Sequence, residues 1–339
     1  MNETAEKYIR TLPGHKPGNA REVIWFGNGF NLCFGMNDWD EVIGKLAEEY
    51  GTEELVKSCG SLPETMRIVA LTRDNVDRAM QSFASVLRSQ VLSAEHAELY
   101  RRLFSLPVDD FLTTDYDFLP ERSLDDHSAI ARRSLAGEPS GAGTGGNSLR
   151  GCRRWTKKVT ETEKQFHLYE YTENRIGGKE KRIWHLHGDL FAPSSIVMGH
   201  YYYGKAVRCI GDRIRALMKS GELRNRDVPF AAQSWVDLFL TSDVHVIGFG
   251  AHLSEFDFWW LLCEKKRLFP ETKVYFHCPE GKLDGGTGAL LSAYGAEICT
   301  YLLREIGTDA KGKKKYDYTG YYLSVIEKLG SVLGGEEQG

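Results

Sequence analysis

The segment His185-Leu186-His187-Gly188 offers the clearest acid–base chemistry in this sequence. A neutral imidazole titrates at about pH 6.5 and suits a general base. We expect His187 to be catalytic, because it lies nearer the end of a predicted strand and Gly188 lets the chain bend away. A structural histidine packed in the core is the alternative. Residues i and i+2 of a strand share a face, so both histidines could also bind a metal ion, but no nearby cluster completes such a site and we expect no metal.

Two aspartates form a second candidate set, just beyond a predicted strand over residues 110–114. Asp115 and Asp117 come directly after Thr113 and Thr114. In open α/β sheets, ligands bind beyond the carboxyl ends of the strands. These polar side chains could therefore grip a ribose or position a water molecule. The alternative is that one of the aspartates caps the following helix by accepting hydrogen bonds from backbone amides.

Glycine turns follow two further predicted strands. Gly27-Asn28-Gly29 comes directly after residues 23–26, and Gly248-Phe249-Gly250 closes the strand that starts at residue 243. Glycine lets the backbone approach a pyrophosphate, whose charge is met by amide groups and a helix N-terminus. The complete G-x-G-x-x-G fingerprint is missing, because residue 32 is leucine, and Asn-Gly is also common in hairpin turns. After the second turn, Ser254, Glu255 and Asp257 could contact a ribose or phosphate, or Ser254 could cap a helix.

The order of predicted strands and helices indicates the fold that must position these motifs. Strands are predicted over 23–26, 110–114, 243–248, 273–276 and 297–301, and a β-hairpin over 166–171 and 181–186 flanks Gly177-Gly178. Helical patterns cover 38–50, 76–106, 201–223, 256–268 and 318–332. This alternation predicts an α/β fold with a doubly wound, mainly parallel, Rossmann-like sheet and a smaller helical insertion.

The chain divides into three predicted parts: an N-terminal extension over 1–21, an α/β domain over 22–305, and a C-terminal helix and tail over 306–339. Within the domain we expect helical insertions over about 45–106 and 200–225, and a mobile loop over about 123–165 where glycine and proline cluster. Lysine and arginine concentrate between residues 150 and 182. We interpret that stretch as a solvated surface and expect no nucleic-acid partner.

Composition excludes several classes of protein. The net charge of −4 and the isoelectric point of about 6.2 give no general attraction to nucleic acid or to an anionic membrane. No apolar run reaches the roughly 18 residues that a membrane span needs. The seven cysteines are scattered and include no C-x-x-C pair, which disfavours a disulfide framework and a four-cysteine zinc module. We therefore expect a cytoplasmic protein.

Taken in order, these motifs resemble the sirtuin-like NAD-binding family. The resemblance covers most of residues 22–305 and is strongest to prokaryotic anti-phage proteins of the abortive-infection type, which destroy NAD. The segment Gly27-Asn28-Gly29-Phe30 also resembles a related abortive-infection family, which usually has aspartate where this chain has Asn31. The resemblance implies that His187 is catalytic, that Asp115 and Asp117 lie beside the nicotinamide ribose, and that His277 lies near the adenosine. It also implies further NAD-binding residues: Gly27, Asn28, Gly29, Asn31, Thr114, Gly248 and Gly250.

Two departures from that family shape the expected function. The missing zinc module argues against protein deacylation, and Asp115 stands at the family asparagine. A carboxylate donates a hydrogen bond only when protonated, although it can stabilise an oxocarbenium-like ribose by charge. We expect an NAD glycohydrolase that acts in anti-phage defence by NAD depletion. The alternative is a non-catalytic module that binds NAD or ADP-ribose and regulates an oligomeric assembly. Without a recognisable sensor domain, control is expected from homo-oligomerisation or a partner such as a defence ATPase.

Overall fold

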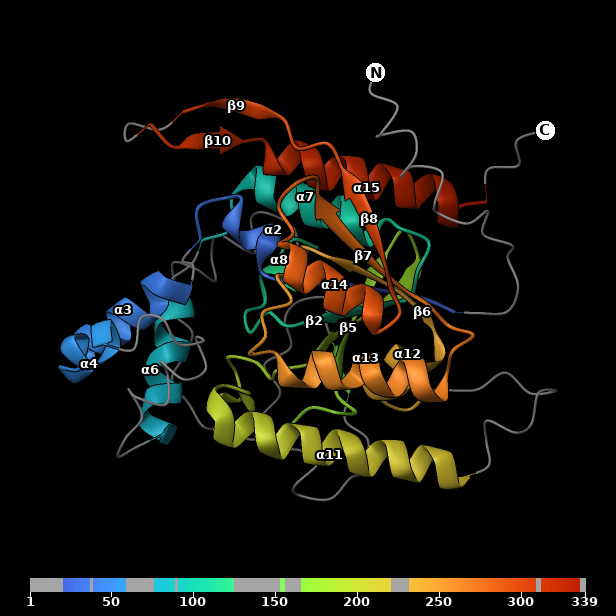
Figure 1. The fold of residues 1–339 in the computed structure, drawn as a ribbon, viewed down its shortest axis with the longest axis horizontal. Helices are drawn as coiled ribbons and strands as arrows, with labels where there is room; N and C mark the ends of the chain where they lie inside the picture. Colours follow the sequence, from blue (N-terminus) through green and yellow to red (C-terminus); the bar gives the residue numbers. More distant parts are fainter. Residues whose placement is uncertain are drawn as a thin grey trace.

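An eight-stranded sheet forms the centre of the structure (Figure 1). The computed structural model describes residues 21–36, 39–58, 76–88, 91–124, 153–155, 166–220, 232–308 and 312–335. The strands of the sheet are β1 (Glu22–Phe26), β2 (Asp110–Thr113), β3 (Arg153–Trp155), β4 (Tyr171–Ile176), β5 (Lys179–His185), β6 (Asp243–Ile247), β7 (Val274–Pro279) and β8 (Ala296–Tyr301).

The strand order identifies the edge at which a ligand is expected. Six neighbouring strands, in the order β5-β2-β1-β6-β7-β8, are parallel. β4 and β3 extend the β5 side in antiparallel fashion. The parallel part has the order of Rossmann-like sheets, and the direction of winding reverses between β1 and β6, where such sheets bind ligands. The prediction of an α/β fold with a mainly parallel sheet is thus confirmed.

Helices cover both faces of the sheet. α7 (Ala94–Phe104) and α15 (Tyr318–Leu333) pack on one face, and α11 (Gly199–Ser220), α12 (Trp235–Thr241), α13 (Phe256–Leu268) and α14 (Gly285–Ala293) on the other (Figure 1). Three helices form a group beside the sheet: α3 (Trp39–Tyr50), α4 (Glu53–Ser58) and α6 (Val76–Arg88). Short turns of helix complete the fold: α2 (Gly29–Leu32), α8 (Leu119–Arg122) and the 3₁₀ turn η1 (Pro193–Ser195).

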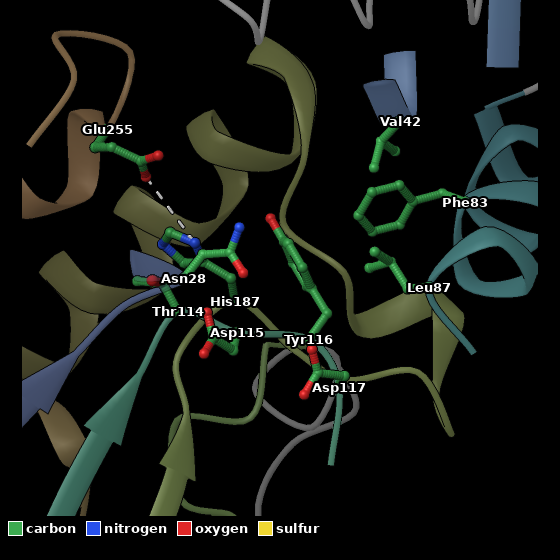
Figure 2. Close-up of a pocket in the computed structure, with 10 residues that line it drawn as sticks. All are labelled: Asn28, Val42, Phe83, Leu87, Thr114, Asp115, Tyr116, Asp117, His187 and Glu255. Carbon is green, nitrogen blue, oxygen red and sulfur yellow. Dashed lines mark ion pairs between the residues drawn. The ribbon is translucent and has the colours of Figure 1, made fainter. Parts of the chain in front are cut away.

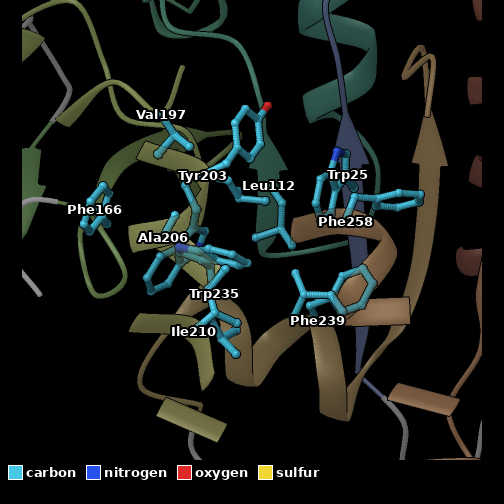
Figure 3. Packing of buried hydrophobic residues seen from close by; sticks show 14 of the residues in the cluster. Trp25, Leu112, Phe166, Val197, Tyr203, Ala206, Ile210, Trp235, Phe239 and Phe258 are labelled. Carbon is cyan, nitrogen blue, oxygen red and sulfur yellow. The ribbon is translucent and has the colours of Figure 1, made fainter. Parts of the chain in front are cut away.

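Strand β1 shows how the sequence builds two cores. Side chains alternate along a strand, so Val23 and Trp25 face one helix layer, and Ile24 and Phe26 face the other. Trp25 packs edge-on against Phe239 and Phe258, with ring centroids 5.5 and 5.4 Å away (Figure 3). Burial on both faces explains why this parallel strand reads as a continuous apolar run.

The helical and hairpin predictions need correction in places. The helix predicted over 76–106 is two helices, because the Ser93 side chain accepts the His96 amide and starts α7 as a new helix. The hairpin around Gly177-Gly178 is present, but its first strand begins at Tyr171, and residues 166–169 form a turn. A second, two-stranded sheet was not predicted; it is formed by β9 (Glu305–Thr308) and β10 (Lys314–Tyr316).

Several predicted segments lie largely outside the described residues. These are the N-terminal extension up to residue 20, residues 125–152 and 156–165 of the loop predicted over 123–165, and the last four residues of the tail. In the part of the chain that the structure describes, no helix combines the length and the apolar character that crossing a membrane requires.

Candidate functional site

Two glycine turns meet where the strand order reverses. The Gly29 amide donates to the Gly248 carbonyl oxygen at 2.9 Å, and the Gly27 amide donates to the Ile247 carbonyl at 3.1 Å. A Cβ atom on Gly29 would lie 2.7 Å from the Gly248 oxygen, which is too close for any side chain. Gly248 itself has a φ of +66°, a conformation that favours glycine. These glycines therefore let the β1 and β6 loops pack against each other.

The same contacts bear on the expected pyrophosphate site. The amides of Gly27 and Gly29 already donate to carbonyl oxygens of the β6 strand and loop. Asn28 between them lines the pocket, and its backbone amide donates to no backbone carbonyl among the described residues. A pyrophosphate contact through Gly27, Gly29, Gly248 and the exposed Gly250 stays a prediction that comes from the family resemblance.

A pocket lies at the carboxyl edge of the sheet, between the strand ends and the α3–α6 helices (Figure 2). Its polar side carries groups that follow β1, β2, β5 and β6. Its apolar side comes from α3 and α6 and stands across the cavity from His187 in Figure 2. The lining residues are Asn28, Val42, Phe83, Leu87, Thr114, Asp115, Tyr116, Asp117, His187 and Glu255. The structure thus brings together five of the predicted site residues.

His187 lies just beyond β5, where the chain turns sharply. Gly188 has a φ of +81°, and a Cβ there would overlap the Ser195 backbone, so the predicted bend is present and requires glycine. The buried imidazole places Nε2 at 2.8 Å from Asp257 Oδ2 and Nδ1 at 4.0 Å from Glu255 Oε2. Burial alone would lower the pKa of His187, but the carboxylates of Asp257 and Glu255 outweigh it and raise the pKa above its ordinary value.

His185 has a different environment and a structural task. Its Nε2 lies 2.9 Å from Glu121 Oε1, and its Nδ1 lies 2.7 Å from the Asp115 carbonyl oxygen. Burial lowers the pKa of His185, yet Glu121 dominates and raises it to about 9. With an acceptor at each nitrogen, the protonated ring donates two hydrogen bonds. His185 and His187 therefore bind separate carboxylates and do not converge on a shared metal position.

Asn31 joins the two aspartates of the pocket. Its Nδ2 lies 3.4 Å from both Asp115 Oδ2 and Asp117 Oδ2, and the Tyr100 hydroxyl donates to its Oδ1 at 2.8 Å. Asp117 Oδ1 also accepts the Leu119 amide at 2.9 Å, at the start of α8. Asp117 thus accepts a following backbone amide, as the capping alternative expected, although the N-cap residue of α8 is Phe118, and this contact coexists with its place in the pocket.

Burial is the leading cause of the raised pKa values of Asp115 and Asp117. Burial, and then repulsion from Asp117, raises the pKa of Asp115 well above its ordinary value. Burial raises the pKa of Asp117 to about 6. The hydrogen bond from the Leu119 amide and the charge of His185 oppose this rise. The raised pKa of Asp115 favours its neutral form, which can donate a hydrogen bond, and the pKa of about 6 leaves Asp117 mostly ionised at pH 7.

His277 lies apart from the other predicted site residues. It is buried in β7, with Nε2 at 3.0 Å from His245 Nδ1 and Nδ1 at 2.8 Å from the Tyr301 hydroxyl. His245 Nε2 in turn lies 3.2 Å from Glu22 Oε2. Both ring nitrogens of His277 thus have protein partners, and a role near an adenosine rests on the family resemblance alone.

Sequence reasoning missed the acidic partners of His187. Glu255 and Asp257 were expected to contact a ribose or phosphate and not His187, and Tyr203, which donates to Glu255 Oε2 at 2.6 Å, was not predicted. The available signal was the strand order, because a turn after β6 must face the end of β1 in a Rossmann-like sheet. Asp257 and Glu255 are also metal-ligand types and lie with His187 in one cluster, but the hydrogen bond from His187 accounts for the Asp257 oxygen nearest to the ring. No protein-family model matches this chain, and neither does any curated protein sequence.

Proposed function

We propose that this protein hydrolyses the bond between nicotinamide and ribose in NAD, and that it acts in anti-phage defence by depleting NAD. The observation that carries the proposal is one pocket, at the reversal of a Rossmann-like strand order, which holds His187 together with Asp115 and Asp117. Dinucleotides bind at this position in such sheets.

The chemistry needs a negative charge near the ribose and a base. Cleavage of the glycosidic bond builds positive charge on the ribose ring, and a nearby carboxylate stabilises it. Asp117 supplies that charge near pH 7, since its pKa is about 6. His187 takes a proton from water or from a ribose hydroxyl.

The raised pKa of Asp115 bears on its place at the family asparagine, because it favours the protonated carboxyl group. As a neutral carboxylic acid, it offers one donor and one acceptor, as an amide does. Its Oδ2 accepts from Asn31, so the rest of the carboxyl group is left to orient a ligand or water. The departure from the family pattern is therefore compatible with turnover.

Purified protein incubated with NAD, over a range of protein concentrations and with or without phage lysate, tests the proposal through nicotinamide release. The concentration series also tests control by homo-oligomerisation, and the lysate tests a partner or trigger. His187→Ala is expected to abolish release, whereas Glu264→Gln is the control, because Glu264 pairs with Arg267 on α13 and does not line the pocket. Equal rates for the parent and His187→Ala would show that His187 has no catalytic role.

Asp115 also favours a second candidate, a module that binds NAD or ADP-ribose without cleaving it. Calorimetry distinguishes the two. Tight binding without nicotinamide release, in the parent and in Asp115→Asn under all of the conditions above, would favour the binding module.

A further inference from the structure

The two nitrogens of His187 have unequal surroundings. Nε2 lies 2.8 Å from Asp257 Oδ2, a normal hydrogen-bond length, and both side chains are buried. Nδ1 lies 4.0 Å from Glu255 Oε2, too far for a direct hydrogen bond. Figure 2 marks this second pair with a dashed line at the side of the pocket. Glu255 lines the pocket, whereas Asp257 does not.

This asymmetry selects one tautomer. Neutral histidine carries a single N–H group, and an ionised carboxylate only accepts hydrogen bonds. The Asp257 carboxylate therefore holds the proton on Nε2. The lone pair then belongs to Nδ1, the nitrogen beside Glu255.

The distance between Nδ1 and Glu255 Oε2 fits one shared oxygen atom. If an oxygen atom lies about 2.8 Å from Nδ1 and about 2.8 Å from Oε2, the angle Nδ1–O–Oε2 at that oxygen is roughly 90°. Water has two O–H groups at a similar angle, so it can donate to both atoms at once, whereas a ribose hydroxyl has only one. Tyr203 fixes Glu255 by donating to the same Oε2 at 2.6 Å.

We propose that Asp257 is a positioning residue that makes Nδ1 the basic nitrogen of His187, and that Glu255 is a catalytic residue that holds the attacking water together with Nδ1. This rests on the proposed function. The water oxygen bonds to C1′ of the ribose as its proton passes to Nδ1. The C1′–N bond breaks, and its electron pair stays on the nicotinamide nitrogen. The products are ADP-ribose, nicotinamide and a His187 imidazolium that Asp257 and Glu255 stabilise.

The tautomer is measured without any substrate. Protein labelled with nitrogen-15 histidine is examined by NMR, with the His187 signals assigned by their loss in His187→Gln. We expect the proton on Nε2 in the parent and a shift of the proton to Nδ1 in Asp257→Asn, whose amide group can donate to Nε2. A parent with the proton on Nδ1, or an Asp257→Asn variant with the parent's tautomer, would overturn the positioning role.

Kinetics test Glu255. We expect Glu255→Gln to lower kcat by roughly 10²-fold with little change in KM, and to move the acidic limb of the pH–rate profile to lower pH. Glu264→Gln is the matched control on α13, where Glu264 pairs with Arg267 at the surface. An unchanged rate and pH profile in Glu255→Gln would refute its catalytic role. If the parent releases no nicotinamide, the catalytic role of Glu255 fails with the proposed function, while the NMR result still decides Asp257.

Discussion

The pair of His185 and Glu121 allows a quantitative test of the charges next to the pocket. The His185 pKa of about 9 implies that the folded protein binds a proton on this ring that the unfolded chain releases at about pH 6.5. Such a group stabilises the fold fully below pH 6.5, and that stabilisation is lost as the pH rises through 9. The difference between the two pKa values corresponds to about 3 kcal/mol in the free energy of unfolding.

The perturbation is Glu121→Gln, which removes the carboxylate that holds the His185 proton. We expect the stability advantage of the parent over this variant to shrink by about 2.5 kcal/mol between pH 7 and pH 9.5. Lys265, whose pKa burial lowers to about 7, also titrates in this range. Its contribution is common to both proteins, so it cancels in the difference between them.

Urea denaturation at pH 6.5, 7.5, 8.5 and 9.5 measures the effect. Buried tryptophans such as Trp25 and Trp235 report unfolding by fluorescence, and circular dichroism provides a second probe. A difference between parent and variant that stays constant with pH would refute the conclusion that His185 is charged in the folded protein.

Three further predictions concern the aspartates and the glycine turns. Asp115→Asn is expected to keep nicotinamide release within about 10-fold of the parent, because the amide reproduces a neutral acid, whereas Asp115→Ala should lose roughly 10²-fold or more; equal rates for both would show that Asp115 has no such role. Release should fall as the pH decreases below 7, because His187, whose pKa is raised, and Asp117, whose pKa is about 6, both take up protons; a flat pH–rate profile from pH 7 to 5 would contradict this. Gly29→Ala should lower stability by about 1–3 kcal/mol, because its Cβ would press on the Gly248 oxygen. Gly44→Ala in α3, where a Cβ meets nothing within 4 Å, should be neutral or stabilising in the same thermal melts.

The parallel strands could be predicted from the sequence because burial on both faces makes them continuous apolar runs. β9 and β10 could not, since they are short and mostly exposed and therefore lack apolar alternation. The break before α7 depends on the cap at Ser93, which the helical pattern on either side concealed. Periodicity alone does not distinguish one long helix from two that are joined by a short segment.

The pocket residues that directly follow strands could be predicted from the sequence, and the others could not. Asp115 and His187 each follow a strand, and strand ends can be located from the sequence. Asp257 follows no such rule: it lies 70 residues beyond His187, and only the packing of β6 beside β1 brings α13 to that side of the pocket. The role of Asn31 as the link between two carboxyl groups depends on side-chain directions, which sequence patterns do not contain.

The hydrogen-bonded series from Glu22 through His245 and His277 to Tyr301 has a consequence for how the sheet aligns. Each residue comes from a different strand, so the series crosses β1, β6, β7 and β8 on one face of the sheet. If β7 slipped by one residue, His277 would turn to the opposite face and leave the buried His245 and the half-buried Tyr301 without this partner. Apolar residues tolerate such a slip more readily, because one aliphatic neighbour replaces another. The polar series thus selects a single alignment of four strands, and with it the position at which each of them ends.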